Sequence, residues 1–376
     1  MKWGVAIAPR NREKLRTVTI MHLSVLLAAL FAAPSLAALP FKGVDWSSLL
    51  VEEKAGRTYK NPAGQVQPLE TILKASGVNT VRQRIWVNPS DGNYNLDYNL
   101  KLAKRAQAAG LQIYLDFHYS DTWADPAHQT KPAAWASLST DALVTQVWKY
   151  TNDVVNAFAA AGIKLALVSI GNEITPGLLW NTGRLSNSDG PKTVAKLLKS
   201  ASNGVKESKM DPKPKILVHL DNGWKADTQT WWYDTVLNSG GGFWTDAFDV
   251  IAVSYYPFYN SAATLSSLSS SLNTISQKWS KDIMVVETNW PVSCPNPAYA
   301  FPSDAKSIPF SSAGQTTWMK EVAKRVAAVP GGRGTGLFYW EPAWIDNAGL
   351  GSSCGSNLMV DSSGKVLDSL AVFKQI

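Results

Sequence analysis

Two glutamates each follow a short apolar segment and could act together in catalysis. Glu173 ends the run Gly171-Asn172-Glu173, and Glu287 directly follows Met284-Val285-Val286. Paired carboxylates across a cleft hydrolyse glycosidic bonds: one protonates the leaving oxygen, and the other attacks the anomeric carbon or activates water. We expect Glu173 to be the acid/base, because Gly171 leaves space and Asn172 offers a donor to a sugar hydroxyl. We expect Glu287 to be the nucleophile, because the apolar run before it holds its backbone in place.

Further polar residues stand at the ends of other strand-like segments. They are Arg82, Arg84, Asp116, His118, His219, Asp221, Tyr256 and Glu341. Alternation along a strand puts Arg82 with Arg84, Asp116 with His118, and His219 with Asp221 on shared faces. Buried charges are costly unless they pair or act, so their presence at successive strand ends predicts one convergent polar site. We expect Arg82 or Arg84, together with Tyr256, to keep Glu287 ionised.

Each of these residues, taken singly, also has a structural interpretation. A glutamate after a strand can cap the next helix. His118 can be a hydrogen-bonded core histidine, and Arg82 can serve only as the ion partner of Asp116. Glu341 is the main rival carboxylate, but Pro342 follows it directly and a structural role is the alternative. The clustering of these residues at strand ends, and no single residue, favours a catalytic site.

Strand-like and helix-like segments alternate along the chain. Strands are expected at Phe41–Ser47, Val78–Trp86, Leu111–Tyr119, Leu165–Glu173, Lys215–Asn222, Asp249–Pro257, Ile283–Trp290 and Gly336–Pro342. Helices are expected at Leu96–Ala109, Asp141–Ala161, Thr193–Lys209 and Thr316–Val329, and also over Ser261–Ser271, where leucines recur at helical spacing. Gly110 and Gly162 follow the first two helices, where a left-handed cap is favoured.

This alternation predicts an α/β fold, a closed (β/α)₈ TIM barrel formed as a single domain by residues 38–376. A doubly wound open sheet is the competitor, but it usually carries a glycine-rich phosphate loop after its first strand. Gly43-Val44-Asp45-Trp46 does not resemble such a loop. In a TIM barrel the active site lies at the C-terminal ends of the strands, where the polar residues above are found.

The N-terminus has the pattern of a secretory signal peptide. Five basic residues precede an apolar run over 18–33, and Ser35-Leu36-Ala37 supplies the small residues of a cleavage site. We therefore expect residues 1–37 to be removed and the protein to be secreted, with Met21 as an alternative start. No later run is long enough to span a bilayer, so we expect no membrane association of the mature form.

The charge of the remaining chain is modest. Of 36 basic and 29 acidic residues, residues 1–37 hold five and one, which leaves 31 basic and 28 acidic and a net charge of +3. The sequence shows no basic patch that would require a nucleic-acid partner. Nothing in it indicates an interface, so we expect a monomer.

Cys294 and Cys354 are the two cysteines of the chain. In a secreted protein they predict a disulfide bond, the alternative being two unpaired thiols. Two cysteines and four scattered histidines lack the spacing of a metal site, so no metal and no cofactor are expected.

Several motifs together resemble glycoside hydrolase family 53. They are Gly43-Val44-Asp45-Trp46-Ser47-Ser48, Val81-Arg82-Gln83-Arg84-Ile85-Trp86, Asp116-Phe117-His118-Tyr119-Ser120-Asp121-Thr122-Trp123, Gly171-Asn172-Glu173 and Val286-Glu287-Thr288-Asn289-Trp290-Pro291. The third motif is the most specific, whereas Asn-Glu occurs in many related barrel glycosidases. The likeness covers about Leu39 to Ile376.

The resemblance implies an arabinogalactan endo-β-1,4-galactanase with a retaining, two-step mechanism on the β-1,4-galactan of pectic type I arabinogalactan. The acid/base carries onto Glu173 and the nucleophile onto Glu287, with their carboxyls about 5–5.5 Å apart. Asn172 would bond the 2-hydroxyl of the sugar that becomes covalently bound, and Trp340 would form the floor of the cleavage subsite. The two cysteines would match the disulfide of the fungal branch, which fastens the loops after strands seven and eight.

Some alternatives stay open. Trp86, Trp123, Trp224 and Trp290 are each either a sugar platform or part of the core. The protein could be another retaining barrel enzyme, such as a mannanase or cellulase, or a sugar-binding barrel without catalysis. Analysis of the products from several polysaccharides would separate these possibilities.

Overall fold

The eight predicted strand segments all form parallel strands in the computed structural model, which describes Met1, Ala6 and residues 38–376. The strands are β1 (Phe41–Asp45), β2 (Thr80–Ile85), β3 (Gln112–Phe117), β4 (Leu167–Ser169), β7 (Lys215–Leu220), β8 (Val250–Ser254), β9 (Asp282–Glu287) and β10 (Gly334–Tyr339). Their order, β1-β10-β9-β8-β7-β4-β3-β2, closes on itself because β1 pairs with both β10 and β2. The predicted (β/α)₈ barrel is confirmed.

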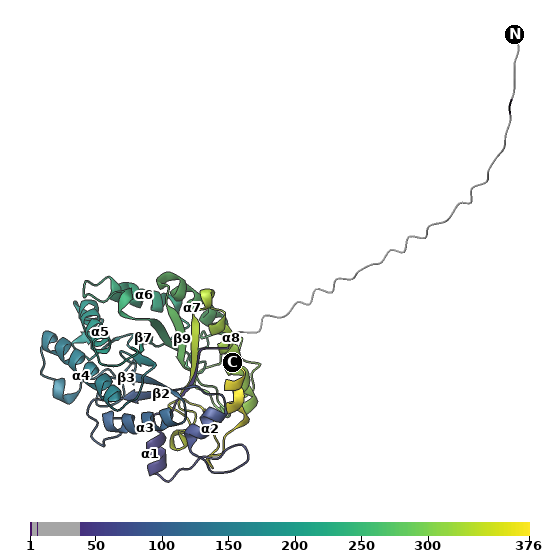
Figure 1. Cartoon of the computed structure of the whole chain (residues 1–376), viewed down its shortest axis with the longest axis horizontal. Coiled ribbons are helices and arrows are strands. Elements are labelled where there is room, and N and C mark those ends of the chain that lie inside the picture. Colours follow the sequence, from purple (N-terminus) through teal and green to yellow (C-terminus); the bar gives the residue numbers. More distant parts are fainter. Residues whose placement is uncertain (2–5, 7–37) are drawn as a thin grey trace. The chain divides into compact units, whose positions relative to one another are not determined.

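Helices surround this barrel (Figure 1). They are α1 (Leu49–Lys54), α2 (Leu69–Ala75), α3 (Leu96–Ala108), α4 (Thr140–Ala160), α5 (Gly190–Lys206), α6 (Ala226–Leu237), α7 (Leu265–Trp279) and α8 (Ser312–Ala327). In α5, for example, Val194, Leu197, Leu198, Ala201 and Val205 are buried, at the spacing of three and four that gives a helix one apolar face. Gly110 and Gly162 each adopt a φ of 70° after their helices, as predicted for left-handed caps.

The boundaries of some elements differ from those predicted. The fourth strand ends at Ser169, so Glu173 lies in an irregular segment four residues beyond the strand. The helix predicted over Ser261–Ser271 begins at Leu265, because the Thr264 side chain caps it by accepting a hydrogen bond from the Ser267 N–H. That helix also continues to Trp279, since Ile275 and Ser276 extend its buried face.

Two buried layers stabilise the barrel. Side chains that alternate inward from the strands, including Tyr114, Leu217, Met284 and Phe338, form a cluster within the barrel. The outward-facing side chains pack against the helices in a second, larger cluster. Gly43 on β1 accommodates the inner layer, because a Cβ atom at this position would lie 2.2 Å from the Phe338 ring.

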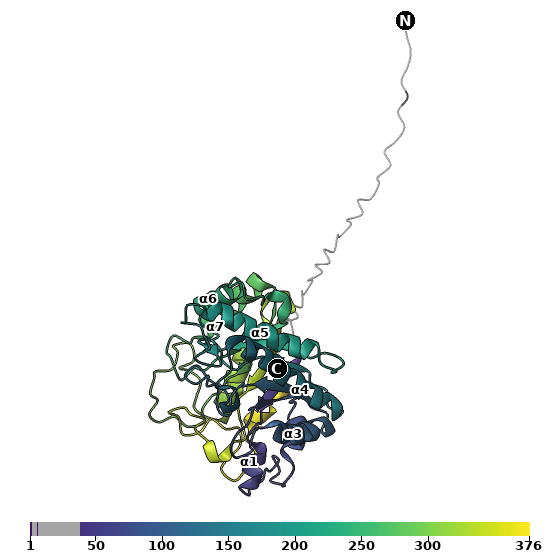
Figure 2. The same cartoon turned by 90° about the vertical axis from the view of Figure 1, so that its left-hand side faces the viewer.

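Long connections follow several strands, and Figure 2 shows segments without regular structure gathered on one side of the barrel. The segment after β4 includes a small antiparallel sheet of β5 (Gly177–Leu178) and β6 (Gly183–Arg184). The predicted disulfide joins Cys294, after β9, to Cys354, after β10. Among the described residues, no helix is both long and apolar enough to cross a membrane. The signal-peptide interpretation of residues 1–37, including a start at Met21, lies outside the described residues except for positions 1 and 6.

Candidate active site

A cavity of about 620 Å³ opens at the C-terminal ends of the strands. Of the eleven residues predicted for the site, nine line it: Arg82, Arg84, His118, Asn172, Glu173, Asp221, Tyr256, Glu287 and Trp340. The other two, Asp116 and His219, are fully buried beside lining residues, which they contact. The fold therefore brings side chains from distant parts of the sequence to one place.

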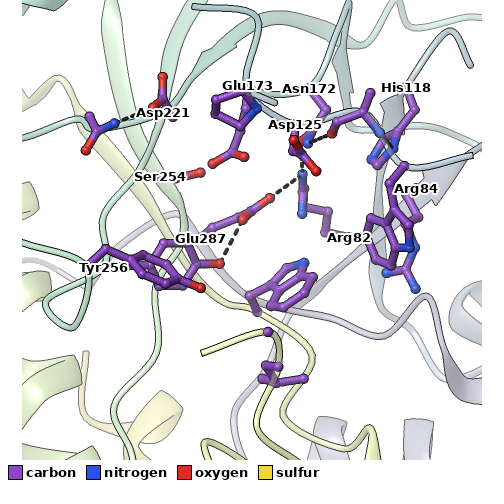
Figure 3. A pocket seen from close by; sticks show the side chains of 18 of the residues that line it. Arg82, Arg84, His118, Asp125, Asn172, Glu173, Asp221, Ser254, Tyr256 and Glu287 are labelled. Carbon is purple, nitrogen blue, oxygen red and sulfur yellow. Dashed lines mark hydrogen bonds and ion pairs between the residues drawn. The ribbon is translucent and has the colours of Figure 1, made fainter. Parts of the chain in front are cut away.

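Glu287, the last residue of β9, is held by two donors. Its Oε1 lies 2.9 Å from Nη2 of Arg82, and its Oε2 accepts a hydrogen bond of 2.8 Å from the Tyr256 hydroxyl (Figure 3). Burial raises the pKa of Glu287, whereas Arg82 and Tyr256 act in the opposite direction by stabilising the carboxylate. Arg82, and not Arg84, is thus the arginine that stabilises the charged form of Glu287.

Glu173 occupies the opposite side of the same cavity, and Figure 3 shows its carboxylate directed toward that of Glu287. Its backbone is left-handed, with a φ of 48°, and Gly171 two residues earlier has a φ of 132°. This sharp turn beyond β4 directs the side chain into the cavity. Burial, followed by the negative charges of Glu287 and Asp221, raises the pKa of Glu173 well above its usual range. Glu173 therefore retains a proton more readily than Glu287 does.

Arg82 connects the elements around the nucleophile candidate. Its Nη1 lies 2.9 Å from Asp45, and its Nη2 lies 2.8 Å from both Asp116 and Asn172. Although burial opposes it, the carboxylates of Asp116 and Glu287 raise the pKa of Arg82, so the guanidinium stays charged. A buried cation with this many partners has one orientation, and Glu287 is positioned by it. Asp45 is the last residue of β1, and a charged residue at a strand end was a signal for the site. Asp45 was nevertheless assigned no role in the sequence analysis.

His118 is a neutral histidine with a defined tautomer. Its Nδ1 accepts hydrogen bonds from the indole of Trp86 at 3.1 Å and from the Ala124 N–H at 3.0 Å. The proton is therefore on Nε2, which lies 3.2 Å from Asp116. Burial lowers the pKa of His118 despite the neighbouring carboxylate. For Asp116, burial is outweighed by Arg82 and His118, which lower its pKa.

His219 and Asp221 lie at the C-terminal end of β7, the strand that pairs with β4 in the barrel. Burial lowers the pKa of His219 to about 3, so the ring is neutral where its Nε2 lies 2.8 Å from Ser254 Oγ. Burial raises the pKa of Asp221, whose carboxylate accepts a hydrogen bond from the Asn222 side chain. Ser254 also lines the cavity, and its place at the end of β8 was the signal by which sequence reasoning could have identified it.

Arg84 and Glu341 form a separate ion pair. Arg84 Nη1 lies 2.6 Å from Glu341 Oε1, which also accepts a hydrogen bond from the Ser48 N–H. The other oxygen of Glu341 accepts one from the Ser48 hydroxyl. With both oxygens engaged and an exposure of 1%, Glu341 has the structural role considered as its alternative.

The tryptophans divide between cavity and core. Trp123, Trp224 and Trp340 line the cavity, as does Trp344, which sequence reasoning did not single out. Trp290 is fully buried against Phe301 and Trp318, so its interpretation as a sugar platform is wrong. Trp86 is also buried, and its indole orients His118. Local sequence could not separate these roles because each tryptophan follows or ends a similar strand.

The chemically active groups of the site are paired carboxylates. Among the residues that the structure describes, no group of three His, Cys, Asp or Glu side chains is placed to hold a metal ion. The arrangement of Glu173 and Glu287 can supply one protonated and one ionised carboxyl to a bond placed between them.

Comparisons with known proteins show a family match and several similar enzymes. The family described as glycosyl hydrolase family 53 matches residues 41–373. An arabinogalactan endo-β-1,4-galactanase of Thermothelomyces thermophilus is 60% identical over 339 residues, which are 90% of this chain and 100% of the relative. A solved fungal β-1,4-galactanase structure is 60% identical, with a TM-score of 0.88, and covers 90% of this chain and 100% of its own. The family 53 catalytic domain of Ignisphaera aggregans is 32% identical, with a TM-score of 0.79, over 91% of this chain and 97% of its own.

Proposed function

The chain belongs to glycosyl hydrolase family 53, and we propose that it is an arabinogalactan endo-β-1,4-galactanase that cleaves galactan with retention of anomeric configuration. The observation that carries the chemistry is the pair of facing carboxylates, of which only Glu287 is bonded to Arg82 and Tyr256 among the described residues. The names of the relatives support the substrate.

In the first step, Glu287 attacks the anomeric carbon while Glu173 donates its proton to the glycosidic oxygen. The bond from carbon to oxygen breaks, the leaving chain departs as an alcohol, and a galactosyl ester forms on Glu287. Arg82 and Tyr256 stabilise the attacking carboxylate before the step. The raised pKa of Glu173 keeps it protonated until the proton is needed.

In the second step, Glu173 removes a proton from water, which attacks the same carbon and releases Glu287. Esterification removes the negative charge of Glu287, one of the causes that raise the pKa of Glu173. The pKa of Glu173 therefore falls once the intermediate has formed, which suits its change from acid to base.

Asn172 and Trp340 complete the proposed cleavage subsite. Asn172 Oδ1 accepts a hydrogen bond from Arg82, and its Nδ2 donates one of 2.7 Å to the Ala124 carbonyl. An amide nitrogen has two hydrogens, so the second is available to the sugar 2-hydroxyl. Trp340 offers a ring on which the sugar can stack.

The decisive experiment compares the purified protein on linear β-1,4-galactan, galactomannan, carboxymethyl-cellulose and β-1,3-galactan. We expect a rapid fall in viscosity and short oligosaccharides from the first polymer alone, with the β-anomer appearing first by NMR. Glu287→Gln and Glu173→Gln should each lower kcat by at least about 10³-fold on the polymer. Cleavage of another polymer instead would point to a mannanase or cellulase, and binding without cleavage would indicate a sugar-binding barrel.

We also propose that the protein is secreted after removal of residues 1–37. The Cys294–Cys354 disulfide supports this, because such bonds persist in oxidising compartments. N-terminal sequencing of the protein from culture medium should then begin near Ala38. Retention of residues 1–37 in the exported protein would contradict the proposal.

A further inference from the structure

Arg84 is a buried cation that lines the cavity without bonding to either proposed catalytic glutamate. Its side chain is 1% exposed, and in Figure 3 it lies on the far side of Arg82 from Glu287. Glu341 at 2.6 Å and Asp45 at 3.7 Å balance the charge. Among the described residues, its Nε and Nη2 atoms are buried without a hydrogen-bond partner.

Three aromatic rings lie close to the Arg84 guanidinium. The central carbon of the guanidinium, Cζ, lies 4.3 Å from the ring centre of Tyr94, 4.4 Å from that of Trp123 and 5.2 Å from that of Trp344. A cation placed over aromatic faces is attracted by their quadrupoles, most strongly when water is excluded. Arg84 therefore interacts with these rings through its charge and its flat face.

The two tryptophans beside Arg84 form one wall of the cavity. Trp123 and Trp344 are stacked, with ring centres 6.1 Å apart and planes inclined by 20°, and both line the cavity. Trp123 follows β3 and Trp344 follows β10, strands that are separated in the barrel by β1 and β2. Arg84, at the end of β2, is the charged group that both rings contact.

We propose that Arg84 is a positioning residue that holds Trp123 and Trp344 as a stacking surface for galactosyl residues of the substrate. This inference rests on the proposed function. A galactose unit presents an apolar face of C–H groups on the side of the ring opposite to its axial O4, and such faces stack on indole rings. Glu341 and Asp45 keep the Arg84 guanidinium in place. This role explains why Glu341, a buried carboxylate that is not part of the reaction, lies just beyond the C-terminal end of β10.

The test removes the charge without leaving its partner unpaired. In the double variant Arg84→Met with Glu341→Gln, both charges disappear together, since loss of one alone would leave a buried ion uncompensated. We expect KM for galacto-oligosaccharides to rise about tenfold while kcat changes less than about twofold. Arg84→Lys should show a smaller rise in KM, because lysine restores the charge but not the flat stacking face. The matched control is Arg82→Lys. Arg82 contacts Glu287, so this substitution should lower kcat instead of raising KM.

A cycle of variants separates positioning from general structure. If Arg84 acts by holding Trp123 and Trp344, its effect should be small once Trp344 is replaced by alanine. Introducing the double variant into Trp344→Ala should then raise KM by less than about twofold. Near-ultraviolet circular dichroism should change similarly in Trp344→Ala and in the double variant. Additive effects on KM, or a fall in kcat with KM unchanged, would overturn the proposal. If the double variant does not fold, Arg84→Lys replaces it in the cycle, and its effect on KM is compared with and without Trp344→Ala. Should the wild type fail on galactan, the proposed function fails, whereas the dichroism comparison still tests Arg84.

Discussion

Two glutamates of the same type acquire different chemistry from the groups that surround them. Glu287 receives a cation and a hydroxyl donor, while Glu173 faces the negative charges of Glu287 and Asp221. Their affinities for a proton are thereby separated in the direction that an acid and a nucleophile require. Tyr256, which bonds to Glu287, is a residue outside the pair at which this difference can be tested.

Tyr256→Phe should move the acidic limb of the pH profile. The hydroxyl bonds more strongly to the ionised form of Glu287 than to the protonated form, so its loss raises the pKa of that carboxyl. Because the nucleophile must be ionised, the acidic limb of kcat/KM should shift to higher pH, with a fall of roughly tenfold at the optimum. The alkaline limb, which belongs to Glu173, should move less. A shift of the acidic limb to lower pH would contradict the proposed role of Glu287.

At the scale of elements, the site depends on the loops that follow the strands as well as on the strands themselves. Trp344, Asn347, Leu350 and Gly351 line the cavity from the loop after β10. The Cys294–Cys354 bond attaches this loop to the one after β9. The disulfide therefore restrains one wall of the proposed substrate cleft.

Replacement of both Cys294 and Cys354 by serine should lower the free energy of unfolding and make the loop after β10 more mobile. The bond closes a segment with a sequence separation of 60, for which we expect a loss of about 2–4 kcal/mol in the free energy of unfolding. KM should rise more than kcat falls, because neither cysteine touches the carboxylates. Chemical denaturation and kinetics measure the two effects, with the reduced wild type as control. An unchanged unfolding midpoint would show that the loops are held by packing alone.

At the scale of the whole molecule, the active site lowers the stability of the fold. Glu173 and Glu287 both have raised pKa values because the barrel buries them. A carboxyl whose pKa is raised on folding stabilises the folded state less as pH increases from its unfolded value of about 4.5. Catalytic arrangement and folding stability are therefore in conflict in this protein.

Glu173→Gln should consequently unfold at a higher temperature than the wild type at pH 7. Below about pH 4 both side chains are neutral, and the two proteins should have similar midpoints. As pH rises toward the raised pKa of Glu173, the wild type alone loses stability, and the variant should lead by about 2–4 °C. Scanning calorimetry at pH 3.5 and pH 7 measures this. The control is Glu207→Gln, because Glu207 directly follows α5 and is exposed. A gain of equal size at both pH values would exclude ionisation as its cause.

The sequence by itself determined the fold class, the eight strands and the residues that converge on the cavity. Apolar runs that alternate with helical spacing are local signals, and parallel strands place their C-terminal ends together in any closed barrel. Polar residues at those ends therefore had to meet, and the unusual run from Asp116 to Trp123 identified the family.

Only the tertiary structure decided which of these residues contact one another. Arg82 and Arg84 are equivalent in the strand pattern, yet one stabilises Glu287 and the other pairs with Glu341, a residue 257 positions away. Trp290 and Trp123 likewise look alike in sequence, but packing from α8 buries the first and leaves the second on the cavity wall. Such choices depend on the distances between side chains from different strands and loops, and local spacing does not encode those distances.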